Sequence, residues 1–98
     1  LSEDILMEHA ASSMLDLIEQ KFDSNSKILI VSGSGNNGAD GIALARLLQG
    51  KFDVELYLAS DVKSDMAKLQ LQRAKKVDVK IISTIAQNSY DVVVDCLF

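Results

Sequence analysis

The sequence has no proline and no tryptophan, and it holds a single cysteine and a single histidine among its 98 residues. One cysteine excludes a disulfide within the chain and is typical of a reducing compartment, so we expect a cytoplasmic protein. No apolar run is long enough to span a bilayer, and we expect no membrane association. The net charge is −4 and the one cationic cluster is Arg73–Lys76, which argues against nucleic-acid binding.

No secretory or transit signal is visible either. The chain begins at Leu1 rather than at a methionine and ends at Phe98, inside an apolar run. Its length allows one domain at most. We therefore expect residues 1–98 to be one incomplete domain of a longer protein.

Apolar periodicity divides the chain into alternating helices and strands. A hydroxyl cap followed by acids, at Ser2, predicts the start of a first helix, and a second helix is predicted over about 40–49. A third helix is predicted to begin after Ser60 or Ser64, either of which would be its N-cap. Short runs rich in Val and Ile predict strands at residues 27–31, 54–58, 79–82 and 91–95.

Strands that alternate with helices form a parallel sheet with helical covers, joined by right-handed crossovers. We therefore predict an α/β fold in which the strands, numbered along the chain, lie in the order 3-2-1-4. Strands one and four then meet where the order reverses, and ligands of such sheets bind there, beyond the carboxyl ends of the strands. The segment Gly33–Gly41 leaves strand one at that point and Asp95 leaves strand four, so we expect them to face each other.

A glycine-rich turn connects the first strand to the second helix. Gly33, Gly35 and Gly38 fit the spacing G-x-G-x-x-G, which alone is a weak sign of dinucleotide binding, although backbone N–H groups at a helix start suit an anion. The acid expected about 20 residues further on has only a poor candidate in Asp61. No lysine follows the glycines, so the turn is not a P-loop.

The polar side chains of Asn36, Asn37 and Asp40 crowd this turn. Amide and carboxylate oxygens are ligands for a cation or partners for a polar substrate. In the alternative interpretation the asparagines only adopt left-handed backbone angles, and Asp40 caps the second helix. Asp95 ends a run of valines, where a carboxylate acts as a base, an acid or a cation ligand, or simply opens the next turn.

Other side chains give weaker signals. We interpret His9 as a packed or surface histidine and Cys96 as a small buried hydrophobe. Glu8 and the helix end Arg73–Lys76 are expected to be solvated. The first helix is apolar over much of its circumference. This indicates either cover on two sides, by further chain or by a second subunit in a homodimer, or packing on one side that leaves some apolar residues exposed.

Several of these segments together resemble a known family. Gly33–Gly41, followed by Ala45 and Arg46, resembles the signature G-x-G-N-N-G-G-D-G…A-R of the YjeF N-terminal domain family, the NAD(P)H-hydrate epimerases. Met7–Ala11 is similar to the family element M-E-N-A-G. Val94–Phe98 is similar to V-D-A-L-F, which in the family runs directly into G-T-G. The matches occur in the family's order and span most of the chain.

The resemblance implies a Rossmann-like three-layer α/β/α fold and an isomerase that interconverts the R and S forms of hydrated NADH and NADPH, NAD(P)HX, at nicotinamide C6. It also implies a separate or fused dehydratase that consumes the S form, and a potassium ion near the substrate. Carried over to this chain, the potassium ligands are Asn37 and Asp95, and Asp95 is the catalytic candidate. The implied substrate-binding residues are Asn36, Asn37, Gly38, Ala39 and Asp40.

The chain departs from the family pattern at several positions. Ala39 replaces a glycine, and its Cβ is tolerable in a helix-start conformation but not at positive φ. His9 replaces the asparagine and Ala11 the glycine of the element on the first helix. The chain also stops before G-T-G, so we expect part of the substrate site to come from residues beyond Phe98.

Two other functions stay open on these residues. One is a non-catalytic ligand-binding or scaffold module of the same family, which would tend to lose the polar set kept here as Asn36, Asn37, Asp40 and Asp95. The other is an ordinary NAD-dependent oxidoreductase, which would require a clear acid at the end of the second strand.

Overall fold

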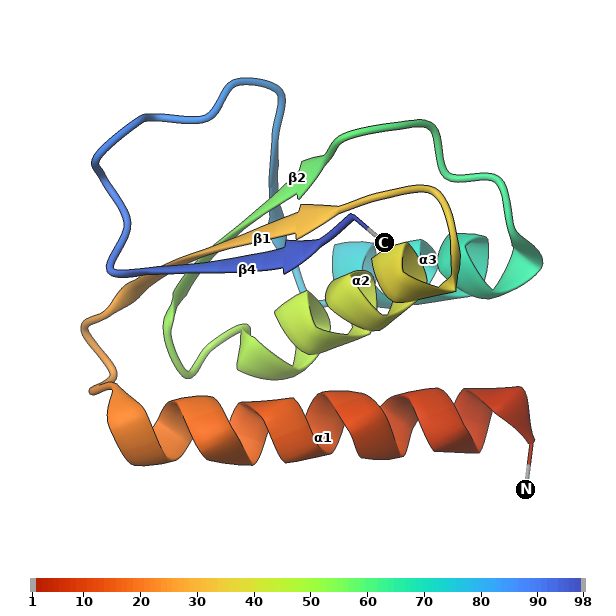
Figure 1. Cartoon of the computed structure of the whole chain (residues 1–98), viewed down its shortest axis with the longest axis horizontal. Helices are drawn as coiled ribbons and strands as arrows, with labels where there is room; N and C mark the ends of the chain where they lie inside the picture. The colour runs from red at the N-terminus through yellow and green to blue at the C-terminus, as the bar shows by residue number, and fades with distance from the viewer. Residues whose placement is uncertain (1, 98) are drawn as a thin grey trace.

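The computed structural model describes residues 2–97, in which helices pack against one parallel sheet (Figure 1). The helices are α1 (Glu3–Lys21), α2 (Asn36–Leu48) and α3 (Asp65–Lys76). The strands are β1 (Lys27–Ser32), β2 (Asp53–Leu58), β3 (Lys80–Ile82) and β4 (Val92–Cys96). Within residues 2–97, every helix falls short of the length and hydropathy that a membrane crossing requires.

The strand order is β3-β2-β1-β4, which confirms the predicted order. In β1, Ile30 pairs with Leu56 of β2 on one side and with Val94 of β4 on the other, and all pairs are parallel. The N–H of Gly33 donates to the carbonyl of Cys96 at 3.0 Å, which extends the β1–β4 pairing into the turn. The segments that follow β1 and β4 therefore emerge side by side at the carboxyl end of the sheet (Figure 1).

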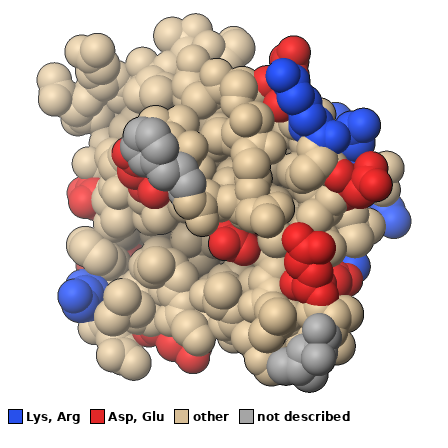
Figure 2. All heavy atoms as spheres, turned by 45° about the vertical axis from the view of Figure 1, so that its right-hand side comes forward, with Lys and Arg blue, Asp and Glu red and all other residues tan. Residues whose placement is uncertain are grey.

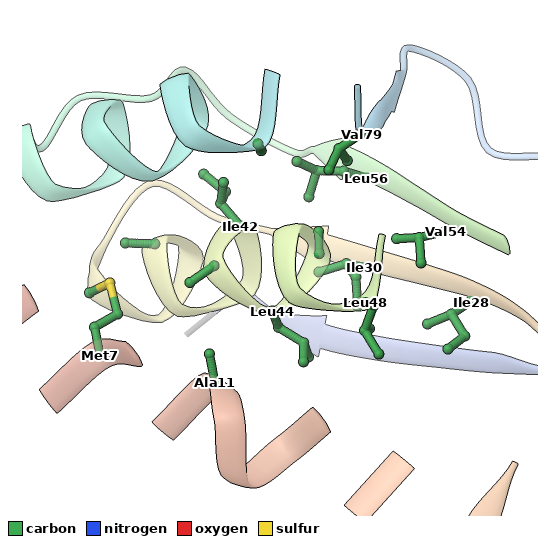
Figure 3. Packing of buried hydrophobic residues seen from close by; sticks show 14 of the residues in the cluster. Met7, Ala11, Ile28, Ile30, Ile42, Leu44, Leu48, Val54, Leu56 and Val79 are labelled. Atoms are coloured by element: carbon green, nitrogen blue, oxygen red, sulfur yellow. The ribbon is translucent and has the colours of Figure 1, made fainter. Parts of the chain in front are cut away.

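The core lies between the sheet and α2. Ile28 and Ile30 of β1 and Leu56 of β2 are fully buried in the cluster drawn in Figure 3. α2 packs against β1, β2, β4 and both other helices. It accordingly buries residues along its whole length, namely Gly38, Ala39, Gly41, Ile42, Ala43, Leu44, Ala45 and Leu48.

The start of α2 differs from the prediction. The helix begins at Asn36, with Gly35 as its N-cap, rather than near residue 40. Asp40 therefore lies inside the helix, and the interpretation of Asp40 as the cap is wrong. The error arose because Gly38 and Gly41 are typical of turns, whereas here both are helical.

The other element boundaries are close to those predicted. Ser2 caps α1, and its Oγ accepts the backbone N–H of Ile5 at 3.2 Å. Ser64, rather than Ser60, caps α3, and its Oγ accepts the N–H of Ala67 at 3.0 Å. Strand ends differ from the predictions by a single residue, which is within the usual uncertainty of strand and helix ends.

The irregular segment 83–91 crosses from β3 to β4 over the sheet face opposite the helices (Figure 1). On that side Glu55 is only 5% exposed, and its carboxylate accepts the hydroxyl of Tyr90 at 2.6 Å. Lys80 and Lys27 lie 3.1 and 3.5 Å from the same carboxylate. The Tyr90 bond, ahead of the two lysines, holds the pKa of Glu55 below its ordinary value. This cluster ties the crossover to β2.

Two glycines allow the start of α2 to approach the sheet closely. A Cβ on Gly38 would collide with the backbone of Gly33. A Cβ on Gly41 would lie 2.5 Å from Ser32 Oγ and 2.9 Å from Cys96 Cβ. Side chains do not fit at these distances, so both positions require glycine for reasons of space.

We expect Gly38→Ala to lower the free energy of unfolding by about 2–3 kcal/mol, because overpacking outweighs the gain in helix propensity. Gly35→Ala is the control, since its Cβ would meet no atom within 4 Å. Gly35→Ala should lower the free energy of unfolding by less than about 1 kcal/mol, because alanine is an unfavourable residue at a helix N-cap. Urea unfolding followed by circular dichroism measures both losses, and equal losses would contradict the packing argument.

Candidate functional site

A cavity of about 250 Å³ lies between α1, the first half of α2 and the end of β4. Part of its lining is apolar and part is polar. The residues that line it are Ala10, Ala11 and Met14 of α1, Asn37, Asp40 and Leu44 of α2, and Val94, Asp95 and Cys96 of β4. The cavity therefore lies at the point where the strand order reverses, as predicted from the topology.

Three of the predicted site residues, Asn37, Asp40 and Asp95, meet in this cavity. Asn37 and Asp40 lie one helical turn apart, so both occupy the same face of α2. Asp95 comes from the neighbouring strand β4. Residues far apart in the chain are thus brought together as the sequence predicted.

The other predicted substrate residues lie in the same turn but outside the cavity lining. Asn36 is exposed at the start of α2, whereas Gly38 and Ala39 are buried. Positive φ occurs among the described non-glycine residues only at Asp78 and Asn88. Ala39 therefore has an ordinary helical backbone, and its fully buried methyl group is accommodated where the family signature has glycine.

The start of α2 is open to an anion. Gly35 at the N-cap offers no side-chain cap, and no acidic residue lies in the first turn. The first backbone N–H groups of a helix lack intrahelical partners and carry partial positive charge. This end of the helix therefore suits a phosphate group, and Asn37 links it to the cavity.

The titratable groups of the cavity are two carboxyls and one thiol. Burial raises the pKa of Asp40, so this carboxyl keeps its proton to higher pH than an exposed aspartate. Burial also raises the pKa of the Cys96 thiol, and the charges of Asp40 and Asp95 add to that rise. Cys96 therefore stays neutral, although it is half-buried rather than fully buried as expected.

Asp95 has two roles in the structure. Its Oδ1 accepts the backbone N–H of Leu97 at 3.0 Å, so Asp95 opens the next turn, as the structural interpretation of this residue predicted. It is also exposed and lines the cavity, a placement that its predicted role as base, acid or cation ligand requires. Phe98, the last residue of the match to the family stretch, lies outside the described residues.

Figure 2 looks towards the carboxyl ends of the strands. Lys and Arg atoms lie towards the rim of this view, whereas acidic atoms lie both at the rim and nearer the centre. Positive potential at the start of α2 thus comes from its backbone rather than from cationic side chains. Within residues 2–97, no group of three or more His, Cys, Asp or Glu side chains is arranged to hold a metal ion.

The apolar wall contributed by α1 was not predicted. Ala10, Ala11 and Met14 belong to the apolar side of a helix that the sequence analysis assigned only to packing. The available signal was the similarity of Met7–Ala11 to a family element. His9, within that element, is exposed, which agrees with its interpretation as a surface residue.

Charged residues form a second cluster between the helices. Arg73 lies 2.8 Å from Asp4 and 3.3 Å from Glu8, and Arg46 pairs with Glu8 as well. The expectation that Glu8 and Arg73 are simply solvated is therefore wrong. The reason is that α1 brings two carboxylates against the arginines of α2 and α3.

Comparison with known proteins assigns the family. The sequence model described as YjeF-related protein N-terminus matches residues 3–98. The chain belongs to this YjeF-related family. The family resemblance seen in the sequence motifs is thereby confirmed.

Individual relatives in the YjeF-related family match nearly the whole chain. One is the "Bifunctional NAD(P)H-hydrate repair enzyme Nnr" of Helicobacter pylori, 42% identical over 99% of this chain and 22% of that protein. Another is the "NAD(P)H-hydrate epimerase" of Oenococcus oeni, 39% identical over 96% of this chain and 47% of that protein. The chain thus spans about half the length of that epimerase and about a fifth of the bifunctional enzyme.

A solved structure in this comparison shows the same fold. The crystal structure of yeast YNL200c superposes with a TM-score of 0.81 at 20% sequence identity. The match covers 100% of this chain and 48% of the yeast chain. At this identity the likeness supports the fold alone, and it confirms the predicted Rossmann-like class for the YjeF-related chain.

We expect Asp40→Asn to change stability in a pH-dependent way. Burial disfavours the charged form of Asp40 and raises its pKa. The contribution of Asp40 to the stability of the wild type is therefore fully present below the ordinary aspartate pKa of 3.8, and it is lost as pH rises through the raised pKa. The variant lacks this loss, so its free energy of unfolding relative to the wild type should increase from pH 3 to pH 7.

Asp4→Asn provides the opposite sign in the same urea titrations. The hydrogen bond from Arg73 lowers the pKa of Asp4, so this carboxylate contributes stability that is lost as pH falls. The loss in free energy of unfolding that Asp4→Asn causes, relative to the wild type, should therefore be largest at pH 7. A difference for Asp40→Asn that does not grow with pH would contradict the partial burial of the carboxylate at that position.

Proposed function

We propose that this protein epimerises the R and S forms of hydrated NADH and NADPH, NAD(P)HX, in nicotinamide cofactor repair. The observation that carries the proposal is one cavity that holds Asn37, Asp40 and Asp95 at the carboxyl end of a Rossmann-like sheet. The names of the YjeF-related relatives support the same reaction. Since the chain spans about half of one such epimerase, we take residues 1–98 as the first part of the domain.

In this proposal the substrate lies along the start of α2. The backbone N–H groups of residues 36–38 face its pyrophosphate, because the uncapped helix end carries the partial positive charge that an anion requires. The side chains of Asn36 and Asn37 hydrogen-bond the ribose or the hydrated ring. Gly38 and Ala39 act through their backbone, since both are buried.

Asn37 and Asp95 are the proposed ligands of a potassium ion. The donor set fits, because an amide oxygen and a carboxylate line the same cavity and hard cations take oxygen ligands. The ion, when bound, supplies a fixed positive charge near the anionic groups of the substrate. The exposed carboxylate of Asp95 remains accessible from the cavity in this arrangement.

Proton transfer is assigned to the two carboxyls. Epimerisation leaves the composition of the substrate unchanged, so every proton taken from it must be returned within the site. Asp95, whose carboxylate is exposed, is the proposed catalytic acceptor. Asp40 is suited to hold a proton beside it, because burial raises its pKa.

The S form would then pass to a dehydratase, fused or separate. The bifunctional names of two relatives support this step, since the chain covers only about a fifth of each. A cytoplasmic location agrees with the single cysteine. For a homodimer, the exposed apolar side chains of α1 offer the contact surface.

The direct test incubates R-NADHX with the full-length protein and follows R/S interconversion by chromatography. We expect the equilibrium mixture to form faster than in buffer alone. No acceleration over the spontaneous rate would rule out the epimerase and favour a non-catalytic module.

Asn37→Ala and Asp95→Ala should each lower the interconversion rate by at least about tenfold, since each removes a positioned polar group. Both should also lose the response to KCl relative to NaCl. Asn25→Ala and Asp16→Ala are matched controls, because both residues are exposed and neither lines the cavity. Retention of rate and potassium response in both site variants would show that the cavity is wrongly assigned.

A further inference from the structure

Glu8 lies at the centre of a polar cluster that joins α1 to both other helices. Both oxygens of its carboxylate accept hydrogen bonds from Nη2 of Arg46 on α2. Its Oε1 also accepts from Nε2 of Gln70 and Nη1 of Arg73 on α3, each at 3.3 Å. One turn earlier, Asp4 accepts two bonds from Arg73, at 2.8 and 2.9 Å. The carboxylate of Glu8 thus contacts α2 and α3 at once.

The groups around Glu8 are partly withdrawn from solvent, although they line an open hollow at the surface. Gln70 is fully buried, and the side chains of Arg46 and Glu8 are 20% and 31% exposed. Within residues 2–97, Gln70 Oε1 and Arg46 Nε have no hydrogen-bond partner. Loss of the Glu8 carboxylate would therefore leave further buried polar atoms unsatisfied, which is costly for charged and amide groups.

The remaining contacts of α1 are largely apolar and are made with α2. The helix packs against α2 rather than directly on the sheet (Figure 1). Several of its large apolar side chains are exposed, and its buried residues are Met7, Ala11 and Ile18. Apolar contact is non-directional, so by itself it specifies the rotation of α1 only weakly. Charge-assisted hydrogen bonds between arginine and carboxylate groups are directional and specify it.

We infer that Glu8 is a positioning residue for the candidate cavity. Ala11 lies one helical turn beyond Glu8 and lines the cavity together with Ala10 and Met14. Asn37 belongs to the α2 side of the same cavity. By fixing α1 against α2, Glu8 sets the separation between the apolar wall and the polar wall.

The pair with Arg46 is the decisive one, because Arg46 belongs to the helix that carries the polar wall. The pair between Asp4 and Arg73 connects α1 to α3, which contributes no residue to the cavity lining. The inference rests on the proposed function, since it takes the cavity as the substrate site. Glu8 itself does not line that cavity and acts through α1.

Glu8→Gln in the full-length protein removes the charge and keeps the shape of the side chain. We expect KM for NAD(P)HX to rise by roughly three- to tenfold while kcat changes by less than about twofold, because the wall moves and the reacting groups do not. Arg46→Lys keeps the charge but replaces the guanidinium that donates to both oxygens of Glu8, and it should give a smaller rise. Asp4→Asn, the matched control, removes the charge from the forked pair that α1 makes with Arg73 and should leave KM unchanged.

A second measurement does not depend on catalysis. Methyl NMR signals of Ala10 and Met14 report the surroundings of the wall directly. Glu8→Gln and Arg46→Lys should shift both signals, whereas Asp4→Asn should leave them in place. Urea unfolding establishes whether each variant is folded. If Glu8→Gln does not fold, KM and the methyl signals are measured on Arg46→Lys instead.

Several outcomes overturn the inference. Unmoved methyl signals would show that Glu8 does not position the wall, and moved signals with an unchanged KM would show that the wall does not serve the substrate. Equal effects of Glu8→Gln and Asp4→Asn on KM and on the methyl signals would show that the cluster only stabilises the fold. Absence of epimerase activity in the wild type would remove the proposed function, while the methyl signals would still decide the placement of α1.

Discussion

The close approach of α2 to the sheet is the contact on which the rest of the structure depends. Gly38 and Gly41 stand where any Cβ would meet the turn or the strands, so the helix axis lies nearer the sheet than side chains would permit. That depth brings the uncapped start of α2 to the carboxyl ends of the strands. Asn37 and Asp95 share a cavity for this reason, although no hydrogen bond joins α2 to β4 there among the described residues.

The sequence predicted the topology because physical rules leave few alternatives. Right-handed crossovers place strands two and three on one side of strand one, and the doubly wound pattern places strand four on the other side. That order sufficed to bring Asp95 beside Asn37 and Asp40. The start of α2 was misplaced because Gly38 is a weak helix former, and its value here is the space it leaves beside Gly33. Such a through-space requirement has no local signature.

The contribution of α1 was beyond the reach of pattern analysis for a related reason. Periodicity identifies which residues of a helix are apolar, but not which neighbour each of them meets. Met14 therefore looked like a packing residue, and Glu8 and Arg73 looked like ordinary surface charges. Their roles depend on how three helices cross, which is set by side chains on all of them.

The position of β4 in the sheet has a consequence for how the protein folds. β4 pairs with β1 across a long separation, and the backbone N–H of Lys27 donates to the carboxylate of Asp91, 64 positions away, at 2.8 Å. Closing so long a loop costs entropy before any pairing compensates it, whereas β1, α2 and β2 assemble from adjacent segments. During synthesis the asparagine turn therefore exists first as an open half-site. In the proposed site, Asn37 and Asp95 come together only when β4 docks on β1.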